Sequence, residues 1–144
     1  NDGRILMIIR NQLGNVGKSY SSDAGDTWSE MESLGLQGPE APATLRRVPS
    51  TGDLVLIWNN TFTPGTGHGG KRTPLTVALS NDEAETWRIV GDLESDASRT
   101  YSYTSLAFIG ERMVMSYWDS GEGDGVLSCR FRSLPVAWLY KATK

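Results

Sequence analysis

The segment Ser21–Trp28, which reads SSDAGDTW, gathers serines, aspartates and a threonine, residue types that enzymes use for acid–base and nucleophilic chemistry. A second copy, SNDEAETW, follows 59 positions later. It repeats four residues of the pattern Ser-x-Asp-x-Gly-x-Thr-Trp, namely Ser80, Asp82, Thr86 and Trp87. Within that pattern it departs only where Ala84 replaces Gly25. A unit that recurs at such a spacing indicates repeat architecture rather than one active site.

Each residue type in this box has a role in folding. Asp23 in a turn accepts hydrogen bonds from nearby backbone N–H groups. Gly25 adopts a positive φ without steric cost. Thr27 favours the strand that follows, and Trp28 inserts a large ring between sheets. We therefore interpret the box as a structural turn, in which Ala84 should strain or rearrange the second copy.

Two glycine-rich loops carry the other reactive side chains. His68 lies in TPGTGHGGKR, where it is either a plain loop residue or reaches over a channel mouth to touch a ligand. This is not a phosphate loop, because it lacks the Gly-Lys-Ser/Thr ending and the strand-to-helix context. Asp119 and Glu122 border DSGEGDG and are expected to be exposed loop acids without the regular spacing of an EF-hand. We expect no metal site and no cofactor.

The composition of the chain argues against several classes of binding partner. The chain has 144 residues, of which 14 are basic and 17 acidic. These charges are dispersed, whereas a nucleic-acid site favours a basic stripe. The single cysteine, Cys129, excludes an internal disulfide and a cysteine-based zinc site. No apolar run approaches the ~20 residues of a membrane span. We expect neither a nucleic-acid nor a membrane partner.

Short apolar runs that follow glycine turns recur along the chain. Three share one plan: DGRILMIIRN (2–11), TGDLVLIWNN (51–60) and IGERMVMSYWD (109–119). Their β-branched and aromatic residues indicate strands. Because the runs are nearly continuous rather than alternating, both faces of each strand should be covered. No helical periodicity persists anywhere, so we predict an all-β chain.

Further strands complete a repeating unit. They are predicted at 41–49 and 101–109, at 17–22, 74–80 and 125–133, and after each box at 27–33 and 86–94. The cycle is a four-stranded meander of about 60 residues, which is typical of a propeller blade. We predict a single half-propeller domain with blades at about 1–36, 37–95 and 96–144.

Three blades cannot close a ring, because closed propellers have about four to eight. The outer faces of the first and third blades would then be bare, a liability in a monomer. The chain also opens on NDGRIL without an initiator methionine or signal peptide, so we expect that upstream sequence is missing or disordered. The prediction is either a homodimer that completes a six-bladed ring or a missing N-terminal half.

The box resembles the Asp box, or bacterial neuraminidase repeat, of the sialidase superfamily. The segments APATLRRVPSTGDLVLIWNN, RTPLTVALSNDEAETW and YSYTSLAFIGERMVMSYWD resemble consecutive blades of that family's six-bladed propeller. The resemblance covers nearly the whole chain and implies the C-terminal half of a sialidase-like glycoside hydrolase. The repeat also occurs in propellers without sialidase chemistry, and a fold alone does not determine function. The family is often secreted or periplasmic, whereas the sequence leaves the compartment open.

The resemblance implies a site for anionic sugars such as sialic acid. Family sialidases bind the sugar carboxylate with three arginines, whose planar forks donate parallel hydrogen bonds, and attack with a tyrosine. Arg10 resembles the second of these arginines and Arg72 the third, although each could be a solvated loop residue. Tyr103 matches the nucleophile, with Tyr101 as the competing register, and could instead pack along the channel. Strand alternation would place both tyrosines on one face.

Other parts of the family's machinery are not found in this chain. The first arginine and the acid/base aspartate belong to earlier blades, and the activating glutamate would lie upstream of Asn1. Without a base, a phenol is a poor nucleophile. Glu40 could stand in, unless it is a solvated turn residue, and Trp58 and Trp118 either bind sugar or pack between blades. Two functions therefore stay open: a hydrolase half-site, or a non-catalytic, self-assembling fragment that binds carbohydrate or serves as an interaction scaffold.

Overall fold

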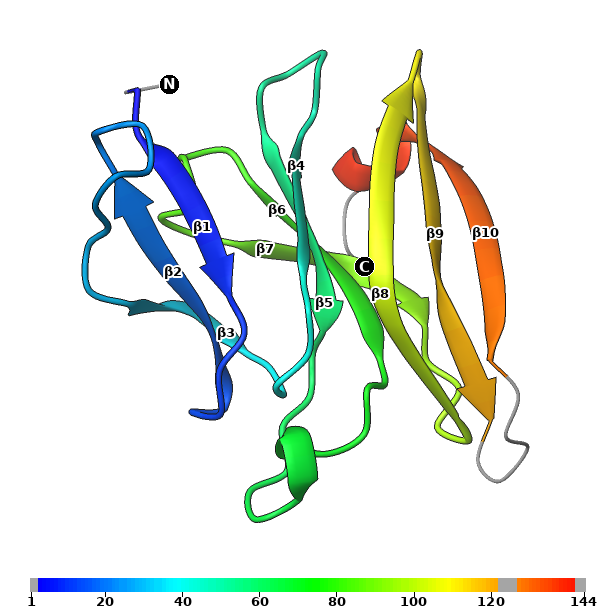
Figure 1. Ribbon diagram of the computed structural model, residues 1–144. Coiled ribbons are helices and arrows are strands. Elements are labelled where there is room, and N and C mark those ends of the chain that lie inside the picture. Colours follow the sequence, from blue (N-terminus) through cyan, green and yellow to red (C-terminus); the bar gives the residue numbers. More distant parts are fainter. Residues whose placement is uncertain (1–2, 122–126, 142–144) are drawn as a thin grey trace.

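The strands form three antiparallel sheets (Figure 1), and the computed structural model describes residues 3–121 and 127–141. Sheet 1 contains β1 (Ile5–Ile9), β2 (Asn15–Ser21) and β3 (Glu32–Gln37). Sheet 2 contains β4 (Thr44–Arg47), β5 (Leu54–Asn59), β6 (Leu75–Ser80) and β7 (Arg88–Glu94). Sheet 3 contains β8 (Arg99–Ile109), β9 (Arg112–Gly121) and β10 (Ser128–Pro135). The all-β prediction is confirmed: the described residues add only two short 3-10 turns, η1 (Gly67–Gly69) and η2 (Val136–Tyr140).

The two central strands of sheet 2 are buried on both faces, because sheets 1 and 3 lie on either side of it. Every residue of β5 and β6 is buried. Along β5, Val55 and Ile57 belong to the core shared with sheet 3. Leu56 and Trp58 belong to the core shared with sheet 1. The continuous apolar runs of these two strands therefore reflect two covered faces, as predicted.

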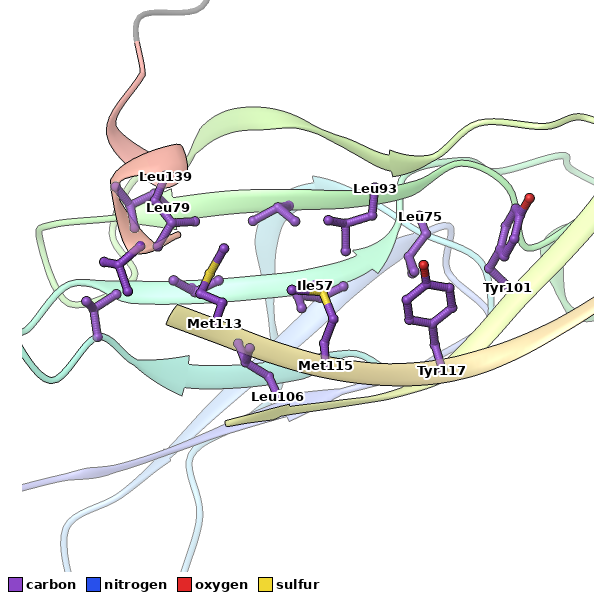
Figure 2. Packing of buried hydrophobic residues seen from close by; sticks show 14 residues of the cluster. Ile57, Leu75, Leu79, Leu93, Tyr101, Leu106, Met113, Met115, Tyr117 and Leu139 are labelled. Carbon is purple, nitrogen blue, oxygen red and sulfur yellow. The ribbon is translucent and has the colours of Figure 1, made fainter. Parts of the chain in front are cut away.

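The core between sheets 2 and 3 is the larger one (Figure 2). It joins Leu75, Leu79 and Leu93 of sheet 2 to Met113 and Met115 of sheet 3. The turn η2 closes one end of this core with Val136 and Leu139, and its Leu139 carbonyl accepts a hydrogen bond of 2.7 Å from Arg88 Nη2. Sequence analysis did not predict η2, because a single 3-10 turn is too short to show helical periodicity.

The outward faces of sheets 1 and 3 are open. On β1, Leu6 and Ile8 pack toward sheet 2, whereas Ile5 and Met7 are exposed. On sheet 3, the exposed apolar residues include Phe131, at 72%. Covering on both faces therefore holds for the run at 51–60 and not for the runs at 2–11 and 109–119. The outer faces of the first and third sheets are bare, as expected, because among the described residues no further sheet lies against them.

Strand β3 begins later than predicted. The expected segment was 27–33, but pairing starts only at Glu32. Before Glu32, Ser29 is bonded to β2 by one backbone hydrogen bond and one bond from a side chain. Its N–H donates to Tyr20 O at 2.9 Å, and its carbonyl accepts from Ser19 Oγ at 2.8 Å.

No helix in the described part of the chain is long and apolar enough to cross a membrane.

Candidate functional site

The first Asp box is a closed hydrogen-bonded turn. Asp23 accepts three bonds: from Thr27 N at 2.9 Å, from Thr27 Oγ1 at 2.5 Å and from Ser21 Oγ at 2.8 Å. The threonine hydroxyl, then its amide, lowers the pKa of Asp23 to about 2. Because both carboxylate oxygens are engaged within the turn, this aspartate stabilises the loop rather than acting on a ligand.

The second box keeps the same geometry despite Ala84. Asp82 accepts from Thr86 N at 2.9 Å and from Ser80 Oγ at 2.8 Å, and the Thr86 hydroxyl lowers its pKa to about 2. Ala84 takes the glycine's role with φ 71° and is fully buried. Of the two predicted outcomes, a strained alanine and a rearranged turn, the structure has the strained alanine.

The two box tryptophans differ in burial. Trp87 packs against the core between sheets 1 and 2. Trp28 is 37% exposed, and its Nε1 donates to Gly25 O at 3.0 Å. The prediction that the box tryptophan inserts between sheets therefore holds for Trp87. It is wrong for Trp28, because among the described residues no sheet lies on that side of sheet 1.

The Glu40 carboxylate contacts side chains from two other loops, the one between β1 and β2 and the one between β5 and β6. Gln12 Nε2 donates to Glu40 Oε2 at 2.9 Å, and His68 Nδ1 lies 3.1 Å from the same oxygen. Arg10 Nη2 lies 3.8 Å from Glu40 Oε1. These neighbours, Gln12 first and then His68, lower the pKa of Glu40. The Glu40 side chain is only 17% exposed, so it is not a solvated turn residue.

Arg72 connects Glu40 to the strand that carries the tyrosines. Its Nη1 donates to Ser102 Oγ at 2.9 Å, and its Nη2 donates to the backbone carbonyl of Glu40 at 3.3 Å. The guanidinium carbon lies 5.6 Å from the centroid of the Tyr103 ring, within the range of a cation–π contact. The guanidinium is therefore oriented by three neighbours while part of the side chain stays exposed.

Tyr103 occupies an irregular point of β8. The register with β9 shifts between Ser102 and Ser105, and Tyr103 has φ 53°, in the left-handed region. This irregularity interrupts the alternation: Tyr101 is 1% exposed, whereas Tyr103 is 47% exposed. The Tyr103 ring contacts the Trp118 ring, with centroids 4.4 Å apart and planes tilted by 44°. The prediction that the two tyrosines share a face is wrong. Only Tyr103 is accessible to a ligand, and strained backbone of this kind clusters at functional sites.

Asp119 is not the exposed loop acid that the sequence suggested. It is 2% exposed and accepts hydrogen bonds from Arg99 Nε, at 2.5 Å, and from Arg130 Nε. Burial raises the pKa of Asp119, but the bonds from the two arginines outweigh this and lower it. Glu122 lies outside the described residues. Within residues 3–121 and 127–141 no group of three or more histidine, cysteine or acidic side chains could hold a metal ion.

A tyrosine–glutamate pair also occurs away from the predicted site. The Tyr117 hydroxyl donates to Glu94 Oε1, and Arg132 Nη1 lies 3.3 Å from the same oxygen. Burial, followed by the bond to Glu94, raises the pKa of Tyr117 to about 12. Tyr117 is 2% exposed. This pair therefore holds sheet 3 to the end of β7 and offers no nucleophile to solvent.

The structure connects most of the predicted ligand-binding residues into one group. We call Arg10, Glu40, His68, Arg72 and Tyr103 the Glu40 cluster. Tyr101 is instead part of the buried core. Trp58 is also buried, and its Nε1 donates to Gln37 O at 2.9 Å.

Two members of the site were missed by sequence analysis. Gln12 contacts the Glu40 carboxylate, and Ser102 accepts a bond from Arg72. Their only signal was position, since Gln12 follows Arg10 by two residues and Ser102 separates the two tyrosines. Polar residues of these common types carry no signal by themselves.

Stacked antiparallel sheets in which Asp-box turns join neighbouring strands, β2 to β3 in sheet 1 and β6 to β7 in sheet 2, define a β-propeller-like repeat protein. Residues 1–114 match the family of the BNR repeat-like domain, so the chain belongs to that family. Among solved structures, it is similar to the sialidase of Trypanosoma rangeli in complex with the inhibitor DANA, with a TM-score of 0.64 and 15% identity. That match covers 90% of this chain but 21% of the sialidase, and at this identity it shows the fold alone. No curated protein sequence gives a significant match.

Proposed function

We propose that the chain supplies part of the sugar-binding site of a sialidase-like propeller, in which Arg10 and Arg72 bind the carboxylate of an anionic sugar such as sialic acid. The observation that carries this proposal is that both arginines reach Glu40. Arg10 faces its carboxylate at 3.8 Å, and Arg72 donates to its carbonyl. Guanidinium groups suit an incoming carboxylate, because each can donate paired hydrogen bonds to it.

Tyr103 is the proposed nucleophile of this site. Its hydroxyl would pass a proton to a base and attack the anomeric carbon. The bond from that carbon to the leaving oxygen then breaks, and the oxygen takes a proton from an acid. Among the described residues no carboxylate hydrogen-bonds to the Tyr103 hydroxyl. In this proposal the acid and the base come from another part of a complete ring.

The three sheets would be three blades of a six-bladed ring. Trp28 supports this arrangement, because its counterpart Trp87 packs against the core shared with the preceding sheet. Trp28 and Met31, both more than a third exposed, lie where a blade before sheet 1 would cover them. The missing blades would come from a second copy or from the rest of a longer chain. Light scattering of the purified 144-residue chain distinguishes these sources, since a stable folded monomer would exclude the second copy.

A second candidate function is that of a non-catalytic propeller fragment that binds glycans or serves as an interaction scaffold. The absence of a carboxylate bonded to Tyr103 among the described residues favours this alternative for the isolated chain. The hydrolase and the glycan-binding module use the arginines in the same way and differ in whether Tyr103 reacts, whereas an interaction scaffold would need neither.

One assay separates the two functions. The chain and its Tyr103→Phe variant are incubated with a fluorogenic sialoside, and sialic-acid binding is measured by calorimetry on the same samples. Turnover that Tyr103→Phe abolishes supports the hydrolase. Binding without turnover supports the glycan-binding module, and the absence of both overturns the proposal. Tyr20→Phe is a matched control, because the Tyr20 hydroxyl has no hydrogen-bond partner among the described residues.

A further inference from the structure

Asn59 is a buried polar residue at the end of β5, where the chain enters the connection that leads to Arg72. It is 1% exposed. Its Nδ2 donates to three backbone carbonyls, those of Arg72 at 2.9 Å, Pro74 at 3.3 Å and Tyr101 at 3.0 Å. An amide nitrogen carries two hydrogens, so two of these acceptors share one of them. A single side chain therefore joins the end of the β5–β6 connection to the start of β8.

The segment that carries Arg72 is bonded along the start of β8. Tyr101 N donates to Arg72 O at 2.9 Å, so this carbonyl accepts bonds from both Asn59 and β8. One residue further on, Thr73 Oγ1 donates to the carbonyl of Arg99. The position of Arg72 relative to β8 is thus set through its backbone as well as through its side chain.

The same amide bonds to β8 two residues before Tyr103. The regular pairing of β8 with β9 is interrupted after Ser102. The bond from Asn59 to Tyr101 O therefore supplies a fixed point directly before the irregular stretch. Tyr103 follows with its positive φ, and its ring lies 5.6 Å from the guanidinium carbon of Arg72. Asn59 is consequently bonded to the backbones of both segments whose side chains meet in this cation–π contact.

The contribution of Asn59 is its hydrogen-bond donor. Rotating the amide by 180° would place Oδ1 against three carbonyl oxygens, none of which can donate, so these acceptors determine the orientation. In this orientation Oδ1 is buried and has no hydrogen-bond partner among the described residues. An unpaired buried acceptor lowers stability. The amide is therefore not an optimal group for filling the core, and a leucine of similar size would lack the donor.

We propose that Asn59 is a positioning residue of the Glu40 cluster, whose amide holds the Arg72 guanidinium over the Tyr103 ring. Asn59 acts through Arg72 and does not itself touch a ligand. The positioning stands on the hydrogen bonds alone, whereas its effect on sugar binding rests on the proposed function. Without the amide, the Arg72 segment is free to shift relative to β8. The guanidinium then leaves the ring, and the carboxylate of an anionic sugar loses one of its two arginines.

Asn59→Leu tests this inference, with Thr76→Val as the matched control. Thr76 is also fully buried in sheet 2, and valine removes one buried hydrogen bond, from Thr76 Oγ1 to Asp92 Oδ1 at 2.6 Å. Circular dichroism and urea denaturation establish that both variants fold and how much stability each loses. NMR then measures the nuclear Overhauser contact between the Arg72 side chain and the Tyr103 ring. We expect this contact in the unmodified chain and in Thr76→Val, and its loss in Asn59→Leu.

A contact that persists in folded Asn59→Leu overturns the inference, whatever the sugar does. If Asn59→Leu does not fold, the smaller and polar Asn59→Ser takes its place in the same comparison. A loss of the contact in both Asn59→Leu and Thr76→Val also overturns the inference, because general destabilisation would then explain it.

Calorimetry with sialic acid on the same samples separates this inference from the proposed function. Where the unmodified chain binds the sugar, we expect an affinity about tenfold lower in Asn59→Leu and little change in Thr76→Val. Equal affinities in the two variants would overturn the role of Asn59 in the site. If no sample binds sialic acid but the contact is lost only in Asn59→Leu, the proposed function fails and the positioning role of Asn59 is supported.

Discussion

Thr44 and Thr104 join the first strand of sheet 2 to the first strand of sheet 3: Thr44 Oγ1 lies 2.6 Å from both the carbonyl and the hydroxyl oxygen of Thr104. Thr104 directly follows Tyr103 and lies in the irregular part of β8. The strained tyrosine is therefore fixed by the neighbouring sheet, and Arg72 approaches it from the connection between β5 and β6 of that sheet. The Glu40 cluster depends on the packing of two sheets rather than on one loop.

Replacing Arg72 by lysine tests the carboxylate site. Lysine keeps the positive charge but loses the planar fork, so it cannot donate paired hydrogen bonds to a carboxylate while bonding to Ser102. We expect the affinity for sialic acid to fall about tenfold or more. Calorimetry measures the affinity, and circular dichroism verifies the fold. Arg112→Lys is the control, because among the described residues the Arg112 side chain bonds only to Ser133, on the neighbouring strand β10. Equal affinities in the two variants would contradict the role of Arg72.

The Asp boxes should make stability depend on pH in acid. The pKa values of Asp23 and Asp82 are about 2 in the folded chain, against 3.8 without the turn. A lowered folded-state pKa means that the stabilisation is complete above the unfolded value and is lost as the pH falls toward 2. We expect the free energy of unfolding in urea to decrease across that interval.

The variant Asp23→Asn/Asp82→Asn should lose part of this pH dependence, because its boxes no longer titrate. Carboxyl-carbon NMR provides the direct measurement of both groups. A midpoint near 3.8 for either aspartate would show that its turn bonds are not maintained in solution.

The two boxes allow a reciprocal test of backbone strain. Gly25 has φ 104°, and a Cβ atom there would meet only Trp28, at 3.9 Å. Gly25→Ala should therefore destabilise the chain by about 1–2 kcal/mol through strain alone. Ala84→Gly should change stability by less than about 1 kcal/mol, because relief of strain offsets the loss of a buried methyl group. Urea denaturation measures both variants. A larger loss for Ala84→Gly than for Gly25→Ala would contradict this explanation.

Asp119 should be a major source of stability in sheet 3. Asp119→Ala leaves Arg99 and Arg130 without their buried carboxylate, so we expect a loss of about 2 kcal/mol. Glu30→Ala is the control, since Glu30 is exposed. Urea midpoints of the two variants provide the comparison. If both variants are as stable as the unmodified chain, the buried ion pairs contribute nothing net.

The repeated features were accessible from the sequence. Two Asp boxes 59 residues apart and the glycine turns before apolar runs predicted the all-β class. The pairing of Arg10 and Arg72 with a tyrosine came from family resemblance, and the structure connects these residues through Glu40. Their roles in binding are predictions.

Turn chemistry and strand runs are local properties of the chain, so the sequence by itself determined the type and order of the strands. The burial of a side chain depends on which element packs against it, so only the tertiary structure decided it. Tyr101 and Tyr103 are two residues apart, yet the irregular register of β8 buries one and exposes the other. Trp28 and Trp87 occupy equivalent box positions, yet only Trp87 packs into a core shared by two sheets. In the sequence Asp119 resembled a loop acid, whereas in the structure β8 and β10 place arginines beside it.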